Sequence, residues 1–409
     1  MKHSDDLRHL ADCASCRQRF ARNVVPFDSA RRHEGALKFA AAAAQLESER
    51  GETADVVARQ LRDTPQSEWP RLAESKALRN NAALEQLSDE VRKRLERNPA
   101  EALIIADLAA SIAESISNTY PPLVIAQIRS TALRDRANAL RYLGKLDEAY
   151  DVIETAESRL NDFPAAVHDR AIIWFVKAMI LAQMDHFDEA ETMINAASVI
   201  FADVNDSARF LQAGIIHGNL LGRQKRYAEA ENLFGDLLKI AVNTGDVETE
   251  ARLHNNLGHC AVYAGDYASA NVHFSESIAR FTDLGLRAEV PRTNLGAAQV
   301  LIGKHQIDAG LVRLEDARRS FVALKMFGEA GLCALRIIEV LIDRGDTVRA
   351  RALTSAVIDE FTAAGVDIRA VQAIEQLQST IDVDGATAEA VRTVHEFVRP
   401  FAVDQAQAS

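Results

Sequence analysis

The chain has 409 residues, of which 48% are hydrophobic and 26% are charged, and its formal net charge is −12. These proportions are ordinary for a soluble folded protein, and the small numbers of proline and glycine favour helix over sheet. The negative charge argues against broad nucleic-acid binding, which needs a basic surface. A chain of this length is too long for one compact core, unless the core is spread along an array of repeats.

Residues 1–33 differ from the rest of the chain in charge and in chemistry. They carry seven basic and four acidic residues, a net charge of +3, so the remaining residues carry −15. His9, Cys13 and Cys16 form an H-x3-C-x2-C pattern, and imidazole and thiolate groups at such spacings are preferred zinc ligands. We predict one zinc ion in this segment, with a reversible dithiol switch and an incidental cysteine pair as alternatives.

This pattern resembles the core of the zinc-binding anti-sigma domain. The resemblance covers about residues 1–30 and rests on His9, Cys13 and Cys16. His3 is the nearest candidate for a fourth zinc ligand, and His33 or a water molecule are alternatives. The resemblance implies that a sigma factor is one possible partner.

Residues 34–78 are predicted to form a helical connector. Residues 39–62 are rich in Ala, Glu and Arg, which favours a helix. Thr64-Pro65 and Trp69-Pro70 are predicted breaks, because proline disfavours helix in the residue before it.

Residues 79–367 carry three series of residues with a common spacing. An alanine or glycine recurs every 40 or 41 residues, at Ala149, Ala190, Ala230, Ala270, Gly310 and Ala350. A second series contains Phe201, Phe281, Phe321 and Phe361, with Ala241 at the missing place. A third contains Gly245, Gly285 and Gly365, with Lys325 at the fourth place. Three series in one register indicate a repeat array.

Each repeat has the pattern of two antiparallel helices. A small residue lies twelve positions before the recurring alanine, at Ala137, Ala178, Gly218 and Gly258. A bulky apolar residue follows that alanine by four positions, at Ile153, Ile194, Phe234, Phe274 and Leu314. This pattern resembles the roughly forty-residue variant of the tetratricopeptide family. The resemblance implies an all-α solenoid, in which stacked helix pairs bind other proteins.

Six units are predicted between about residues 125 and 365. A degenerate seventh unit precedes them, because residues 98–102 read as the start of its second helix, and an insertion follows at Pro121-Pro122. In the fifth unit Gly296 lies fourteen positions before Gly310, so we expect a turn two residues longer at Lys304–Ile307. Residues 368–409 are expected to cap the array and to end in a tail.

The first helix of each pair lines the concave groove in the family that the chain resembles. The polar groove candidates in units one, three and four are Arg134, Asn138, Arg141, Gln212, Asn219, Arg252, Asn255 and His259. In units five and six the candidates are apolar, namely Val290, Val300, Leu332 and Leu335. Asparagine side chains would hold a peptide backbone and arginines its carboxylates, and an unused solvated face is the alternative interpretation.

The sequence contains no phosphate-binding loop, nucleophile elbow or H-E-x-x-H motif, so we expect no enzyme. Cys260 and Cys333 are expected to be core residues. No stretch has the pattern of a signal peptide or a membrane span, so we expect a cytoplasmic protein.

The leading hypothesis is a non-enzymatic regulatory adaptor whose array binds a protein or peptide. An anti-sigma factor and a sensor whose groove closes on a small molecule or signal peptide are the alternatives. The sequence leaves the oligomeric state open.

Overall fold

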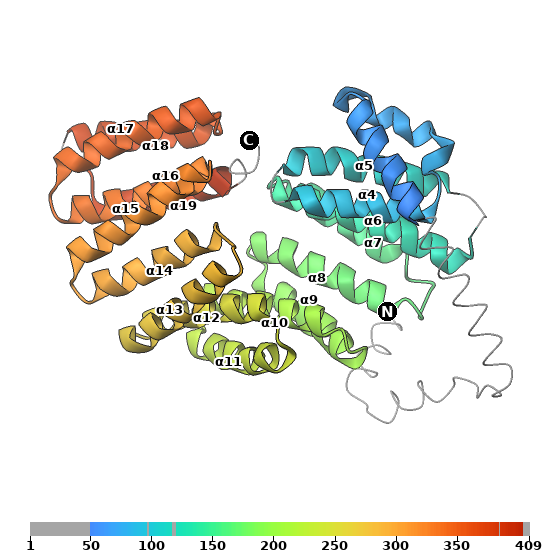
Figure 1. Cartoon of the computed structure of the whole chain (residues 1–409), viewed down its shortest axis with the longest axis horizontal. Coiled ribbons are helices and arrows are strands. Elements are labelled where there is room, and N and C mark those ends of the chain that lie inside the picture. Colours follow the sequence, from blue (N-terminus) through green and yellow to red (C-terminus); the bar gives the residue numbers. More distant parts are fainter. Residues whose placement is uncertain (1–49, 96–97, 117–119, 384, 404–409) are drawn as a thin grey trace.

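The computed structural model describes residues 50–95, 98–116, 120–383 and 385–403, and every regular element in these ranges is a helix (Figure 1). A first helix spans 50–63 within the described part. The other elements are η1 (Gln66–Glu74), η2 (Lys76–Leu78), α4 (Asn81–Leu95), α5 (Pro99–Ser115), α6 (Pro122–Tyr142), α7 (Leu146–Ser158), α8 (Val167–Gln183), α9 (Phe187–Asp203), α10 (Ser207–Arg223), α11 (Tyr227–Thr244), α12 (Val247–Tyr263), α13 (Tyr267–Asp283), α14 (Glu289–Gly303), α15 (Ile307–Ala323), α16 (Phe327–Asp343), α17 (Thr347–Ala364), α18 (Ile368–Asp382) and α19 (Ala388–Val403).

The helices from α6 to α17 form the six predicted pairs, and α4 with α5 forms the degenerate pair before them. The recurring small residues are buried where the two helices of a pair cross, and the bulky residues four positions later are at most 3% exposed. At Gly258 an added Cβ would lie 2.7 Å from Cε1 of Phe274, so a larger residue does not fit there. The prediction of an all-helical, tetratricopeptide-like solenoid is confirmed for the described residues.

The turns of the array repeat one backbone conformation. Within the pairs, the second turn residue has a positive φ at Gly144, Asp185, Lys225, Gly265, His305 and Gly345. Between pairs, the same conformation occurs at Asn205, Gly245, Gly285, Lys325 and Gly365. Glycine adopts this left-handed region at no steric cost, whereas a residue with a Cβ is strained there. The third sequence series therefore marks helix ends, and Lys325 takes the strained conformation that its position imposes.

The prediction of a longer turn in the fifth unit is wrong. Helix α14 ends at Gly303 and α15 begins at Ile307, so the turn has the same length as the turn between α16 and α17. The small residue at the helix crossing is Ala298, which is fully buried and lies twelve positions before Gly310. Gly296 lies two residues before Ala298 and is also buried, and the prediction took it for the residue at the helix crossing. Every position assigned in α14 from Gly296 is therefore displaced by two residues.

Neighbouring helix pairs contact each other beside the turns that join the two helices of each pair. Tyr263 at the end of α12 stacks on Tyr227 at the start of α11, with ring centroids 4.3 Å apart and planes 8° apart. One unit earlier, the guanidinium of Arg223 lies 5.0 Å from the ring centroid of Phe187. These contacts join the last turn of one first helix to the preceding second helix, which fixes the rotation between units.

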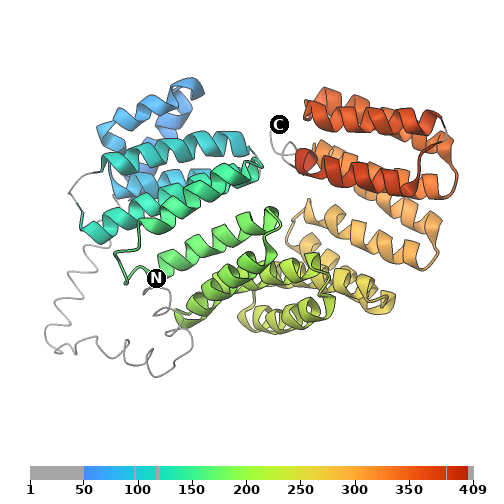
Figure 2. The same cartoon turned by 180° about the vertical axis from the view of Figure 1, so that it is seen from behind.

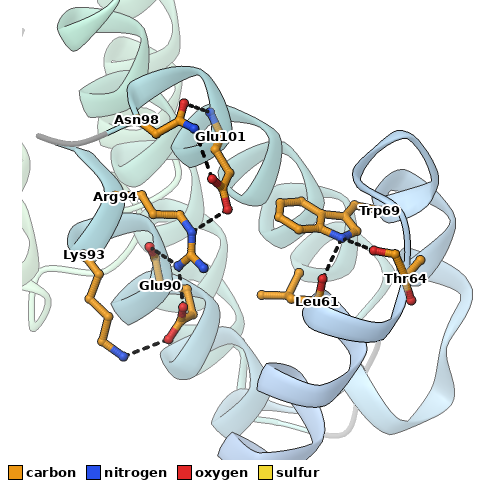
Figure 3. Close-up of polar contacts among 8 residues, drawn as sticks. All are labelled: Leu61, Thr64, Trp69, Glu90, Lys93, Arg94, Asn98 and Glu101. Carbon is orange, nitrogen blue, oxygen red and sulfur yellow. Dashed lines mark hydrogen bonds and ion pairs between the residues drawn. The ribbon is translucent and has the colours of Figure 1, made fainter. Parts of the chain in front are cut away.

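A tryptophan anchors the N-terminal elements on the first pair (Figure 3). Trp69 is 5% exposed, and its indole nitrogen donates hydrogen bonds to the carbonyl oxygens of Leu61 at 3.1 Å and Thr64 at 3.0 Å. It lies in η1, which continues through Pro70 and packs against α5. The break predicted at Trp69-Pro70 is therefore wrong, because the 3-10 helix η1 runs through both residues.

The start of α5 is fixed by a polar network, which Figure 3 also shows. The Asn98 side chain accepts from the Glu101 backbone nitrogen at 3.1 Å and donates to the Glu101 carboxylate at 3.1 Å. These two contacts hold the side chains of Asn98 and Glu101 together at the N-cap of α5, where the Asn98 side-chain oxygen satisfies a backbone N–H of the first turn. Arg94 donates to Glu101 at 2.6 Å and also pairs with Glu90. Burial would raise the pKa of Glu90, but hydrogen bonds from Lys93 and Arg94 hold it below its ordinary value. The predicted second helix of the degenerate unit begins at this cap.

Consecutive first helices contact one another from α4 through α6, α8, α10 and α12 to α14, and consecutive second helices have no comparable contact in the described residues. A stack that is closer on one side must curve toward that side. Both views show this curvature, with α8 and α10 on its inner side and α9 and α11 on its outer side (Figures 1 and 2). The surface of the first helices is therefore the concave side of the array.

The two C-terminal helices pack differently. Helix α18 lies against α17, as a terminal cap is expected to do. Helix α19 turns back and packs mainly along α16, with a smaller contact to α18 (Figure 2). It therefore covers a first helix instead of extending the stack.

Candidate protein-binding face

We define the inner face as three positions on each first helix, which lie six and three residues before the residue at the helix crossing and one residue after it; the crossing residue is small in α6 to α14 and is Ile338 in α16. The positions are Thr131, Arg134 and Asn138 in α6; Ile172, Phe175 and Met179 in α8; Gln212, Ile215 and Asn219 in α10; Arg252, Asn255 and His259 in α12; Arg292, Leu295 and Gln299 in α14; and Leu332, Leu335 and Glu339 in α16. Seven of the eight polar candidates fall on these positions. The eighth, Arg141, lies one turn further along α6 and donates to the Asn138 side chain at 3.0 Å.

The most open part of the inner face is in the middle of the array. The exposed inner-face residues are Gln212, Asn219, Arg252 and Gln299. The other inner-face residues of α10, α12 and α14 are half-buried. Gln212 and Asn219 each carry one amide group that both donates and accepts hydrogen bonds. Amide groups in this arrangement suit the backbone of an extended or helical peptide.

The arginines of the inner face already have partners within the chain. Arg134 donates to the carboxylate of Asp135 at 2.9 Å, and Asp135 is buried, with 6% of the residue exposed. Arg252 pairs with Glu248 at 2.9 Å and reaches Glu289 of the next unit at 3.8 Å. A partner's carboxylate would have to compete with these internal ones, so the arginines are less available than the sequence indicated.

A ladder of charges links the first helices of units four to six. Glu289 lies between Arg252 of α12 and Arg292 of α14, at 3.8 and 3.0 Å, and Arg292 continues to Glu329 of α16 at 2.9 Å. Burial would lower the pKa of Arg292, but the carboxylates of Glu289 and Glu329 raise it above its ordinary value. Arg292 was not among the predicted groove residues, because positions counted from Gly296 are displaced by two residues. The spacing of 40 residues from Arg252 was the signal that could have found it.

An apolar part of the inner face lies on α8 and was also missed. Ile172, Phe175 and Met179 occupy the three positions of this helix, and Ile215 of α10 continues the apolar strip. All four are half-buried. Phe175 also packs edge-on against Phe201 of α9, with ring centroids 6.4 Å apart. The region of units one to four, in which the predicted groove residues were polar, therefore also presents an apolar strip on α8 and α10.

The apolar candidates in units five and six need correction. Val300 is 1% exposed and belongs to the core, because the count from Gly296 was displaced, and Val290 is half-buried and off the inner-face positions for the same reason. Leu332 and Leu335 do occupy inner-face positions. Leu335 is fully buried in the core cluster to which α19 contributes, and the half-buried Leu332 packs against this cluster.

Three half-buried histidines and two buried cysteines of the array have perturbed pKa values. Burial lowers the pKa of His259 to about 4 and raises those of Cys260 and Cys333 to about 11 and about 12. His254 and His273 face each other with their Nδ1 atoms 3.0 Å apart, and burial lowers both pKa values. Both cysteines are therefore protonated core residues at neutral pH, as expected from the sequence.

The predicted zinc ligands His9, Cys13 and Cys16, with His3, lie outside the described residues. Within the described ranges, no three His, Cys, Asp or Glu side chains are placed to hold a metal ion. No helix in that same part of the chain is long and apolar enough to cross a membrane.

Comparison with known proteins identifies the repeat. The tetratricopeptide repeat family model matches residues 214–283, which lie within α10 to α13. No curated protein matches the chain.

Solved structures match over most of the chain. A signal-transduction ATPase with numerous domains from Pyrococcus horikoshii, which has a tetratricopeptide repeat sensor, aligns with a TM-score of 0.54 and 13% identity over 86% of this chain and 53% of its own. The apo form of the quorum sensor NprR from B. thuringiensis aligns with a TM-score of 0.51 and 11% identity, over 83% of this chain and 99% of its own. At such identities the likeness extends to the fold alone. The repeat match and these structures agree that the described chain is a tetratricopeptide-like helical solenoid.

Proposed function

We propose that this protein is a non-enzymatic regulatory adaptor that binds a protein or peptide partner along the inner face of α8, α10 and α12. One observation carries the proposal. In these units the inner face combines a half-buried apolar strip on α8 with exposed amide groups at Gln212 and Asn219 of α10. Interfaces commonly combine an apolar centre with polar groups around it. The two solved structures described above are a quorum sensor and a protein with a repeat sensor, which supports a regulatory use of this fold.

Substitution of the exposed amides tests the proposal. We expect that a variant with Gln212→Arg and Asn219→Arg loses the partner in an affinity pull-down from the native host, because two bulky cations would occupy the amide positions. The matched control carries Asn232→Arg and Asn243→Arg, which are exposed on α11 of the same unit. Equal recovery of every bound protein by both variants would refute the proposed binding face.

We further propose that the N-terminal segment binds zinc and provides a second interaction or modulates the first. His9, Cys13 and Cys16, with His3 as the fourth ligand, would hold one zinc ion that shortens and stiffens the segment. Metal analysis of protein purified without oxygen tests this part. Less than a tenth of an equivalent of zinc would refute it.

Two alternatives make different predictions. An anti-sigma factor would copurify with a sigma factor and would lose it when Cys13 and Cys16 become serine. A sensor for a small molecule or a signal peptide would be stabilised against heat by its ligand, because binding to the folded state alone raises stability. We place the adaptor in the cytoplasm, and a chromosomal neighbour that encodes a sigma factor would favour the first alternative.

A further inference from the structure

Helix α19 occupies the inner face of the last unit. The core cluster contains Leu335 of α16 together with Val391 and Val398 of α19, all three of them fully buried, and Val394 packs against it. Val391, Val394 and Val398 lie at i, i+3 and i+7, so they form one stripe of the helix. At the edge of this stripe Arg392 donates to Glu339 of α16 at 2.9 Å.

The covered positions are those that earlier units leave open. Leu335 and Glu339 correspond to Leu295 and Gln299 of α14, which are half-buried and exposed. The same repeat geometry therefore gives an accessible surface in unit five and a closed one in unit six. The difference is α19.

Helix α19 lies outside the repeats and is held by two helices, α16 and α18. Its longer contact runs along α16 and its shorter one along α18. Its apolar stripe is made of valines, which fill less volume than the leucine and phenylalanine residues of the array core and are weak helix formers. Because valines bury less apolar area than these larger residues, we expect α19 to open locally at lower free energy than the core helices.

We propose that α19 is a resident ligand of the inner face of α16, and that an amphipathic helix of a partner protein displaces it. The chemistry of the occupied site defines this helix. It carries large apolar residues at i, i+3 and i+7 to contact Leu332 and Leu335, and a lysine or arginine at i+1 to pair with Glu339. Larger apolar residues than valine give the incoming helix its advantage, since apolar burial scales with area.

The proposal rests on the proposed function, because it names the kind of partner that the inner face accepts. The displacement of α19 concerns α16, whereas the proposed function concerns α8, α10 and α12, so experiments can refute either one without the other. A partner bound only at Gln212 and Asn219 would leave α19 in place.

A labelled synthetic peptide of residues 385–403, with Val391, Val394 and Val398 changed to leucine, is the probe. Fluorescence anisotropy is measured with the full chain and with its Arg392→Glu variant, in which Glu339 repels α19. We expect the peptide to bind the variant at least tenfold more tightly than the native chain. The same peptide with aspartate at these three positions should bind neither protein. A matched control, Arg319→Glu on the exposed surface of α15, should bind the peptide as the native chain does.

Hydrogen–deuterium exchange tests whether the peptide displaces α19 from α16. We expect the amides of α19 to exchange faster than those of α16 in the free protein, and faster still when the leucine peptide is present. Equal protection of α19 and α16, or peptide binding without release of α19, would overturn the proposal. A stable dimer of the Arg392→Glu variant in light scattering would also overturn it, because the occupant would then be α19 of a second copy. The variant with Gln212→Arg and Asn219→Arg should bind the peptide normally.

Discussion

Tyr263 stacks on Tyr227 with ring planes 8° apart, and the equivalent pair one unit earlier is Arg223 over Phe187. Two different chemistries thus serve the same contact between neighbouring units. In both, a flat group at the end of one first helix lies on the aromatic ring that begins the preceding second helix. The rotation from one unit to the next, and with it the curvature of the inner face, depends on such contacts.

Removal of one ring from this stack should loosen the junction between units three and four. We expect Tyr263→Ala to lower the free energy of unfolding by about 1 kcal/mol, because aromatic pairs contribute roughly this much beyond area burial. Tyr263→Phe retains the stacked ring and should leave stability within about 0.5 kcal/mol of the native value. Urea denaturation followed by circular dichroism measures both, and an equal loss for the two variants would show that stacking is not responsible.

The close approach of α12 to α13 predicts opposite effects for two glycines. Gly258→Ala places a Cβ 2.7 Å from Cε1 of Phe274 and should destabilise the protein by about 1–3 kcal/mol, the usual cost of overpacking. Gly235→Ala on α11 meets no atom within 4 Å and should stabilise it by up to about 1 kcal/mol through helix propensity. Thermal unfolding of the two variants side by side checks this. A stabilising Gly258→Ala would contradict the packing described for the repeat.

The strained turns offer a gain in stability. Lys225 and Lys325 have φ values of 62° and 60°, where glycine relieves a strain of about 1 kcal/mol. We expect Lys225→Gly and Lys325→Gly each to raise the melting temperature, with nearly additive effects because the sites are two and a half units apart. Lys239→Gly within α11 is the control and should lower it. No increase for either turn variant would mean that the conformation carries no strain.

The lowered pKa values of the three half-buried histidines predict a loss of stability in mild acid. In the folded protein burial lowers the pKa of His259 to about 4, whereas an unfolded histidine has a pKa of about 6.5. Below pH 6.5 the unfolded chain therefore binds a proton that the folded chain does not, so stability is full above this pH and falls toward pH 4. His254 and His273 act in the same direction.

His259→Gln isolates this contribution, because Gln299 occupies the equivalent position in unit five. Melting temperatures are measured at half-unit steps from pH 7.5 to pH 4.5. The variant should lose less stability than the native chain over this range. Parallel curves would contradict the burial of a neutral imidazole at position 259.

The repeat made most of the fold predictable from the sequence. Positions 40 residues apart have the same surroundings, so the small and bulky residues alone indicated the pairs from α6 to α17. The prediction failed in α14, where Gly296, Ala297 and Ala298 are three small residues in a row and the wrong one was counted. The inner-face amides could be found by the same spacing once the register was known.

The remaining features depend on contacts that no repeat encodes. The availability of Arg252 is set by Glu289 in the next unit, whose side chain reaches it only in the folded array. The closure of Leu335 depends on α19, which lies outside the repeats and folds back on α16. Apolar residues at inner-face positions are therefore half-buried on α8 and covered by α19 on α16, and the sequence pattern does not distinguish the two cases.

The most direct measurement of the central claim is site-specific photo-crosslinking in the native host. Benzoylphenylalanine is placed at position 219 on the inner face of α10 or at position 243 on the outer helix α11, both of which are exposed. If the inner face binds the partner, the probe at 219 gives a defined crosslinked product and the probe at 243 does not. A product from position 243 alone, or equal products from both positions, would contradict it.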